Sequence, residues 1–294
     1  MEEIYKRHFL NYVSLNDRYT PLDENGSMLI ICYGPFMDSM QPFIDWKIKK
    51  GIQTTMYNVD EIGDASDIKA FKGIVASEIP LTEFDYDENE RYPVHLFLHG
   101  SGERGSDNEL QLYHGSDLFL NDNNRKKYKS WVIFPQSPKN DWWGGNYDPY
   151  KFDYEIKTSQ ALDLVIRFMD EFINRGDVDK NKVYVSGLSM GGMGTFSIIA
   201  ERPNMFAAAT PICGDGDPNN VISFAKKVPI WIFHGALDKT VLPTQSLKMA
   251  NAIMKAGGNP RVTIYENIEH NSWDVAFAEK DFLKWIHSKS KKNE

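Results

Sequence analysis

The sequence predicts an α/β protein of three layers, in which a mostly parallel β-sheet lies between two layers of helices. From about residue 93 onward, short and almost continuously apolar runs alternate with amphipathic stretches. This alternation is typical of parallel strands that are buried on both faces. The polar residues with the clearest chemistry directly follow these runs, and parallel sheets form their sites at the carboxyl ends of the strands. A small βαβα unit is expected to precede this fold.

Six apolar runs are expected to be strands, and four periodic stretches are expected to be helices. The predicted strands are residues 93–99, 130–135, 182–186, 207–212, 228–234 and 261–266. The predicted helices are residues 154–175, 190–200, 243–256 and 273–289. In the first helix, Leu162, Val165 and Phe172 belong to an apolar set that recurs every three or four positions, which indicates one buried face.

The first eighty residues have a different pattern. Strands are expected at 27–33 and 52–59, and helices at 35–50 and 66–75. The acidic stretch 85–91 is a plausible exposed connection to the larger C-terminal region. We therefore expect residues 1–80 to form a non-catalytic appendage and residues 81–294 to form the catalytic domain.

Composition and charge exclude several classes of function. The 294 residues are 41% hydrophobic, which is enough for a substantial core. The formal net charge of −8 argues against nucleic acid as a partner, because phosphate binding requires a basic surface. No apolar run is long enough to cross a bilayer, so no membrane partner is expected.

The N-terminus and the cysteines bear on the compartment. The first residues lack the basic-then-apolar order of a secretory signal, which favours the cytoplasm, although a Met added to a mature secreted or periplasmic form would read the same way. Cys32 and Cys213 both lie in apolar runs and are expected to be buried thiols rather than a disulfide. No Cys/His spacing indicates a metal, and neither a metal nor another cofactor is expected.

The segment KVYVSGLSMGG at 182–192 carries the strongest functional signal. A β-branched run leads into Gly187-Leu188-Ser189-Met190-Gly191, and a helical pattern follows at once. This order of strand, tight turn and helix is typical of a nucleophile elbow, in which the turn exposes the serine Oγ at the edge of the sheet. We therefore expect Ser189 to be a nucleophile.

A serine hydroxyl requires a base to accept its proton and an acid to orient that base. Asp238 lies just beyond the run 228–234, and His270 lies beyond the run 261–266. The order Ser189, Asp238, His270 is the chain order of α/β hydrolases. Alternative acids are Asp215 and Asp217, and the competing histidines are His99, His114 and His234. Of these, His234 is expected to be a structural residue at the sheet edge.

Attack on an ester creates an oxyanion, which requires N–H donors that are already in place. One donor is expected to be the backbone N–H of Met190, at the start of a helix. The other is expected in the loop after the first strand of the main sheet, where Gly100 allows close approach and the N–H of Ser101 is the candidate.

Four segments carry a resemblance to a known group of enzymes. They are YPVHLFLHGSGERG at 92–105, VYVSGLSMGG at 183–192, FHGALD at 233–238 and HNSW at 270–273. Residues from about 91 to 288 thereby resemble the α/β hydrolases that include predicted peptidases, carboxylesterases and polyhydroxybutyrate-depolymerase-like or feruloyl-type esterases. The resemblance implies the hydrolase fold and carries the triad over onto Ser189, Asp238 and His270.

Two further pairs belong to the same resemblance. Trp142 and Trp143 fit the family pattern beside the acyl pocket, where aromatic rings stack on a sugar or a phenolic group, and core packing is the alternative for at least one of them. Glu103 and Arg104 are expected to form a structural ion pair that holds the oxyanion loop in place.

Residues from about 18 to 75 resemble the start of a gingipain-type cysteine peptidase domain. The likeness rests on RYTPL at 18–22, MLIIC at 28–32, QPFIDWK at 41–47 and EIG at 61–63. The later part of that domain, with its catalytic Cys and His, has no counterpart, so no catalytic role is carried over.

The resulting hypothesis is a serine hydrolase that cleaves carboxylic esters through an acyl-enzyme, with acetyl or feruloyl esters, either small or linked to a polysaccharide, as substrates. Two alternatives remain open from the sequence: a serine peptidase acting on short peptides, and a glycan-binding module on a degenerate hydrolase.

Overall fold

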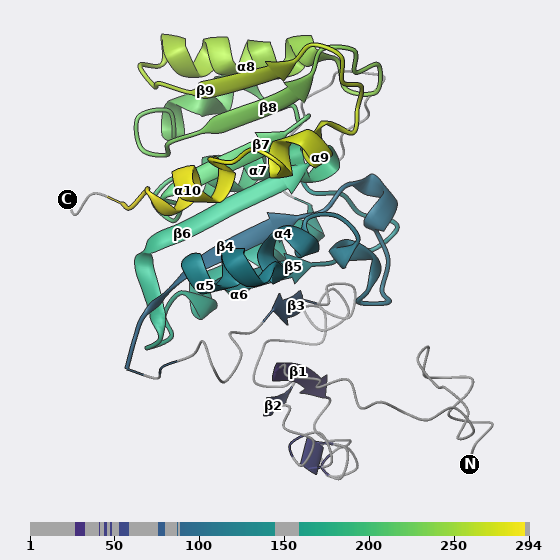
Figure 1. The fold of residues 1–294 in the computed structure, drawn as a ribbon, viewed down its shortest axis with the longest axis vertical. Helices are drawn as coiled ribbons and strands as arrows, with labels where there is room; N and C mark the ends of the chain where they lie inside the picture. Colours follow the sequence, from purple (N-terminus) through teal and green to yellow (C-terminus); the bar gives the residue numbers. More distant parts are fainter. Residues whose placement is uncertain are drawn as a thin grey trace.

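The computed structural model describes residues 89–144 and 159–291, together with the strand segments 27–32, 53–58 and 76–79 and the single positions 41, 44, 45, 48 and 87. Its main feature is a seven-stranded sheet with the strand order β3-β5-β4-β6-β7-β8-β9 (Figure 1). The six strands from β5 to β9 in this order are parallel, and β3 is antiparallel to β5 at one edge. The predicted fold class is therefore confirmed.

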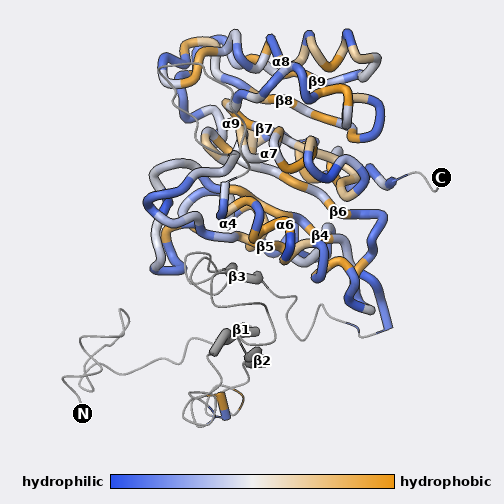
Figure 2. The backbone as a smooth tube through the Cα atoms, turned by 180° about the vertical axis from the view of Figure 1, so that it is seen from behind, coloured by the Kyte–Doolittle hydropathy of each residue, from blue (hydrophilic) through white to orange (hydrophobic). Residues whose placement is uncertain are grey.

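The strands of this sheet are β3 (Ala76–Ile79), β4 (Tyr92–Leu98), β5 (Trp131–Pro135), β6 (Val178–Leu188), β7 (Ala208–Ile212), β8 (Trp231–Gly235) and β9 (Arg261–Tyr265). Strands β4 to β8 are mostly buried, as their apolar runs predicted. Figure 2 shows hydrophobic colour along the central strands and hydrophilic colour at the turns. Strand β9 is an edge strand and is half exposed, which suits its mixed sequence RVTIY.

Helices cover both faces of the sheet (Figure 1). One core cluster joins the sheet to α6 (Gln160–Phe172), α7 (Met190–Glu201) and α8 (Pro243–Lys255). The second cluster joins the other face to α4 (Ser116–Leu120), α9 (Ser272–Phe277) and α10 (Phe282–His287). The helix α5 (Asp122–Lys127) follows α4, and the 3₁₀ helices η2 (Ser101–Glu103), η3 (Leu110–Leu112) and η4 (Pro218–Ser223) lie in loops.

One expected element needs correction, and other elements were not predicted. The predicted helix 273–289 is two short helices, α9 and α10, and the break between them lets Ala276, Phe282 and Ile286 all pack into the second core cluster. The helices α4 and α5 were not predicted, because each spans too few residues for a periodic pattern. The strand β3 was not predicted either, because only Ala76 and Ile79 of its four residues are apolar.

The N-terminal part contains the predicted strands β1 (Ser27–Cys32) and β2 (Gln53–Asn58), which pair in parallel as a separate two-stranded sheet. The predicted helix 66–75 and most of the predicted helix 35–50 lie outside the described residues. The strand β3 precedes residue 80 and yet hydrogen-bonds with β5 of the main sheet. The main sheet thus begins at residue 76, before the boundary expected from the sequence.

Candidate active site

Ser189 lies between β6 and α7 in a strained backbone conformation, with φ of 53° and ψ of −115°. The residues on either side of Ser189 are glycines for a steric reason. A Cβ on Gly187 would collide with the carbonyl of Gly191, and a Cβ on Gly191 would collide with the carbonyl of Leu98 at the end of β4. The two flanking glycines are therefore required for the close approach of strand and helix.

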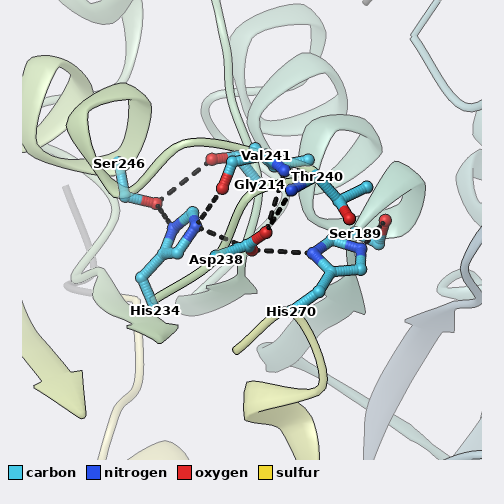
Figure 3. Close-up of polar contacts among 8 residues, drawn as sticks. All are labelled: Ser189, Gly214, His234, Asp238, Thr240, Val241, Ser246 and His270. Carbon is cyan, nitrogen blue, oxygen red and sulfur yellow. Dashed lines mark hydrogen bonds and ion pairs between the residues drawn. The ribbon is translucent and has the colours of Figure 1, made fainter. Parts of the chain in front are cut away.

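His270 connects the predicted nucleophile to the predicted acid. Its Nε2 lies 2.9 Å from Ser189 Oγ, and its Nδ1 lies 2.7 Å from Asp238 Oδ2 (Figure 3). An ionised carboxylate only accepts hydrogen bonds, so Nδ1 carries the proton and Nε2 presents a lone pair to the serine hydroxyl. The serine and the aspartate, 81 and 32 positions from the histidine, thus meet it at one edge of the sheet.

Asp238 has all its hydrogen-bonding capacity occupied, and its side chain is buried. Its Oδ1 accepts from the N–H groups of Thr240 at 2.8 Å and Val241 at 3.0 Å. Its Oδ2 accepts from His270 and from His234 Nε2, which lies 3.1 Å away. Burial alone would raise the pKa of Asp238, but the bonds from His234, His270 and Val241 together lower that pKa well below its usual range.

The other acids proposed as alternatives lie in different environments. Asp215 is buried and its Oδ1 lies 3.4 Å from Lys248 Nζ. Asp217 accepts from the N–H of Asn219 at 2.8 Å and caps η4. His114 is 4.0 Å from Glu103 and packs against Trp273. Of the acids and histidines proposed as alternatives, His234 alone reaches the Ser189–His270–Asp238 group.

Each of the two predicted oxyanion donors is the backbone N–H of the first residue of a helix. Met190 is the first residue of α7, and Ser101 is the first residue of η2. Within the described part of the chain, neither backbone N–H donates to an acceptor, as is usual in the first turn of a helix.

His99 holds the loop that carries Ser101. Its Nδ1 donates to the carbonyl of Gly100 at 2.6 Å, and its Nε2 accepts from the N–H of Ser137 at 2.9 Å. Burial lowers the pKa of His99 to about 4, so the ring stays neutral near pH 7. Because the carbonyl and N–H of a trans peptide point in opposite directions, fixing the Gly100 carbonyl also fixes the direction of the Ser101 N–H.

Arg104 ties the same loop to Trp142. Its Nε donates to the carbonyl of Ser101 at 2.9 Å, its Nη1 donates to the carbonyl of Lys139 at 3.1 Å, and its guanidinium lies 4.2 Å from the ring centre of Trp142. The expected Glu103–Arg104 ion pair is wrong, because no ion pair joins these two described residues. Backbone carbonyls satisfy Arg104 instead, while Glu103 turns toward His114.

The two tryptophans have different surroundings. Trp142 is partly buried under Arg104 and retains exposed surface. Trp143 is only 1% exposed and packs in the main core, with its ring edge-on to His99 at 5.2 Å. Core packing, the alternative left open from the sequence, therefore describes Trp143, and it leaves no face on which a substrate could stack.

Sequence reasoning assigned no role at the site to Cys213 or Trp273, and it left His234 with a structural one. Cys213 follows β7 with a φ of 40°, and burial raises the pKa of its thiol to about 12. Trp273 lies edge-on to His270 at 5.5 Å. Cys213 and His234 lie at the carboxyl ends of strands, and this position could have predicted that they lie near the site, because all such ends meet at this edge of the sheet.

One grouping of side chains has the composition of a metal site. In the described residues, the possible ligand atoms that lie within 4.8 Å of one another belong to Cys213, Asp238 and His270. Two of its members are already hydrogen-bonded to each other, so the group coincides with the site described above. No helix in the described ranges is long and apolar enough to cross a lipid bilayer.

Comparison with known families agrees with this geometry. The sequence profile of the phospholipase/carboxylesterase family matches residues 85–287, which is more than half of the chain. The chain belongs to this family. Its sheet and helices have the α/β-hydrolase fold of that family.

Solved and curated relatives extend the comparison. A thermostable esterase of known crystal structure has 30% sequence identity to this chain and a TM-score of 0.67. The match covers 74% of this chain and 60% of that esterase. An uncharacterised secreted protein of Arthroderma benhamiae is 24% identical over 233 residues, or 69% of this chain and 23% of the relative.

Two relatives match shorter stretches. Gingipain R2 of Porphyromonas gingivalis is 33% identical over 79 residues, or 26% of this chain and 10% of the relative. The bifunctional acetylxylan esterase/xylanase XynS20E of Neocallimastix patriciarum is 32% identical over 88 residues, or 29% of this chain and 12% of the relative. The chain thus spans less than a quarter of the length of these three curated relatives.

Proposed function

We propose that this member of the family is a serine esterase that works through an acyl-enzyme, with Ser189 as nucleophile, His270 as general base and acid, and Asp238 as the group that orients His270. The observation that carries the proposal is the position of the His270 ring, which lies 2.9 Å from Ser189 Oγ and 2.7 Å from Asp238 Oδ2. This chain of hydrogen bonds is what activates an otherwise weak serine nucleophile.

The reaction follows from the protons on these atoms. Ser189 Oγ attacks the ester carbonyl while its proton passes to His270 Nε2, and the resulting imidazolium lies against the ionised Asp238. The imidazolium then returns the proton to the leaving alcohol, and an acyl-serine remains. Water, deprotonated by His270, attacks the acyl-serine and releases the acid by the same steps.

The N–H groups of Met190 and Ser101 are proposed to hold the oxyanion of each tetrahedral intermediate. Their lack of acceptors in the described residues supports this role, as does the position of Met190 at the positive end of α7. A donor of this kind typically contributes about 3–4 kcal/mol of transition-state stabilisation. No metal or organic cofactor is needed for these steps.

The proposed substrate is a short-chain or aryl ester, such as an acetyl or feruloyl group on a plant polysaccharide. The name of the XynS20E relative supports an acetylated sugar, and the exposed part of Trp142 supports a ring that stacks there. Trp142→Ala is then expected to raise KM for an aryl ester about 10-fold and to leave KM for p-nitrophenyl acetate within twofold. Equal effects on both substrates would contradict stacking at Trp142.

The two regions of the chain are proposed to differ in role. Residues 81–294 contain every group named in the reaction, and residues 1–80 contain none of them. We propose that the N-terminal region is a non-catalytic appendage, except that β3 within it belongs to the main sheet. A fragment that starts at residue 74 is expected to keep full turnover, whereas a fragment that starts at residue 81 loses β3 and is expected to be less stable.

A fluorophosphonate probe tests the assignment of the nucleophile. Labelling of the wild type is expected to disappear in Ser189→Ala and in His270→Ala, and to persist in His114→Ala, a nearby histidine outside the reaction. Ester turnover that is unchanged in Ser189→Ala would refute the proposal, as would absence of labelling in the folded wild type.

A pair of substrates separates esterase from peptidase. We expect p-nitrophenyl acetate to be cleaved with a higher kcat/KM than a peptidyl p-nitroanilide. Preference for the anilide would make the enzyme a peptidase with the same three residues.

A further inference from the structure

His234 is a second histidine on Asp238. It is the fourth residue of β8, it is fully buried, and the sequence alone indicated a structural role. Its Nε2 lies 3.1 Å from Asp238 Oδ2 and 2.8 Å from the carbonyl oxygen of Val241 (Figure 3). The same carboxylate oxygen therefore faces two imidazoles, one from β8 and one from the loop after β9.

The acceptors around His234 determine where its proton lies. A carbonyl oxygen and an ionised carboxylate can only accept, so Nε2 must be the protonated nitrogen and must donate to both. His234 thus supplies a donor that does not take part in the proton transfer between Ser189 and His270.

The other face of the ring is also held. His234 Nδ1 lies 2.7 Å from Ser246 Oγ on α8, and the same oxygen lies 3.1 Å from the carbonyl oxygen of Gly214. Gly214 packs against Gly192 in the first turn of α7 so tightly that a Cβ on Gly214 would collide with the backbone of Gly192. A continuous path of contacts therefore runs from Asp238 through His234, Ser246 and Gly214 to the helix that begins just after Ser189.

We propose that His234 is a positioning residue for the esterase reaction: its Nε2–H holds Asp238 Oδ2 in the orientation that receives His270, and its Nδ1 anchors that orientation to Ser246. This inference rests on the proposed function. Both oxygens of Asp238 are occupied, with Oδ1 fixed by the N–H groups of Thr240 and Val241 and Oδ2 fixed by His234. His270 therefore meets a carboxylate that cannot rotate when the imidazolium forms.

Loss of the His234 donor affects the transition state more than substrate binding, because His234 contacts Asp238 and has no contact with Ser189, where the substrate reacts. Outer partners that orient metal ligands typically contribute a factor of about 10 to 100, and we take the same range for a partner that orients Asp238. We expect His234→Leu to lower kcat by about 10- to 100-fold with KM within about twofold of the wild type.

Two variants separate positioning from simple damage to the fold. His234→Gln keeps an amide N–H at the reach of Nε2 and is expected to restore kcat to within about threefold of the wild type. His95→Leu is the matched control: His95 is equally buried, lies on β4 and bonds to the hydroxyl of Ser186, away from Asp238. It is expected to lower the melting temperature without changing kcat of the folded protein.

The anchor to Ser246 has its own test. Ser246→Ala is expected to lower kcat less than His234→Leu does. The double variant is expected to match His234→Leu alone, because both changes interrupt one path and residues that act as a unit are not additive. Additive losses would show that Ser246 and His234 act separately.

Proton NMR gives a readout that does not depend on turnover. The His270 Nδ1–H, held in a 2.7 Å bond to Asp238, is expected to give a protected low-field signal in the wild type. This signal should be lost or shifted upfield in His234→Leu, return in His234→Gln and remain in His95→Leu. A folded His234→Leu variant with the wild-type signal and kcat would overturn the positioning role. A wild type that shows the signal but labels with no fluorophosphonate would instead refute the proposed function, and the NMR series would still decide the role of His234.

Discussion

Replacement of His99 by leucine tests whether this histidine holds the loop that carries the proposed oxyanion donor Ser101. The change removes the donor to the Gly100 carbonyl, at 2.6 Å, and the acceptor of the Ser137 N–H, at 2.9 Å. The Gly100–Ser101 peptide is then free to turn, and the Ser101 N–H no longer has a fixed direction.

The magnitude follows from two separate costs. Complete loss of one oxyanion donor costs about 3–4 kcal/mol, or roughly 100- to 1000-fold in kcat, so a loop that only loosens should lose between about 10-fold and that limit. The orphaned and buried N–H of Ser137 should also reduce the free energy of unfolding by about 1–3 kcal/mol. KM should change little, because the oxyanion exists only in the transition state and the intermediates.

The assay is steady-state hydrolysis of p-nitrophenyl acetate, together with urea unfolding of each variant. His99→Asn is the conservative comparison, since its amide nitrogen takes approximately the place of Nδ1, and it should recover most of kcat. His95→Leu, which changes an equally buried histidine on the strand that leads to His99, should lose stability but keep kcat. A folded His99→Leu protein with wild-type kcat would refute the reasoning.

Three further predictions follow from buried groups. Burial lowers the pKa of His99 and His287 to about 4 and that of His95 well below its usual value. The unfolded chain therefore binds more protons than the folded protein as the pH falls below 6.5. The contribution of these histidines to the free energy of unfolding is therefore fully present above pH 6.5 and is lost between pH 6.5 and about 4. The loss is at most about 1.4 kcal/mol per pH unit for each histidine. Equal unfolding free energies at pH 7.5 and pH 5 would contradict this prediction. The buried Cys213 thiol, with its pKa raised to about 12, should resist iodoacetamide at pH 8 until urea unfolds the chain, as peptide mass spectrometry of Cys213 would show. Gly191→Ala should destabilise the protein by about 3 kcal/mol or more through its collision with the Leu98 carbonyl, whereas Gly102→Ala, with nothing within 4 Å of the new Cβ, should be nearly neutral in thermal melting.

The fold and the order of the site residues could be predicted because both depend on patterns within short segments of the sequence. Each central strand is a run such as VYVSGL that is apolar on both faces, and each proposed reacting residue follows such a run. Parallel strands place their carboxyl ends at one edge, so Ser189, Asp238 and His270 had to be neighbours once the strands were assigned.

Other features could not be predicted, because they depend on contacts between distant segments. The break between α9 and α10 has no glycine or proline to mark it and results from packing against the sheet. Trp143 is fully buried and Trp142 only partly, and this difference depends on distant contacts such as that of Trp143 with His99, more than forty residues earlier. The expected Glu103–Arg104 pair failed because two backbone carbonyls, one of them from Lys139, are better placed for the guanidinium than the adjacent carboxylate.

The sequence by itself determined the layers of the sheet, the strained serine between two obligatory glycines, and the edge where the proposed acid and base lie. These features follow from periodicity and from steric limits within a few residues. Only the tertiary structure decided that Asp238 is shared by two histidines and that His99 fixes the direction of the Ser101 N–H. The direction of a hydrogen bond depends on where two distant side chains come to lie when the sheet is assembled, and no local pattern in the chain encodes it.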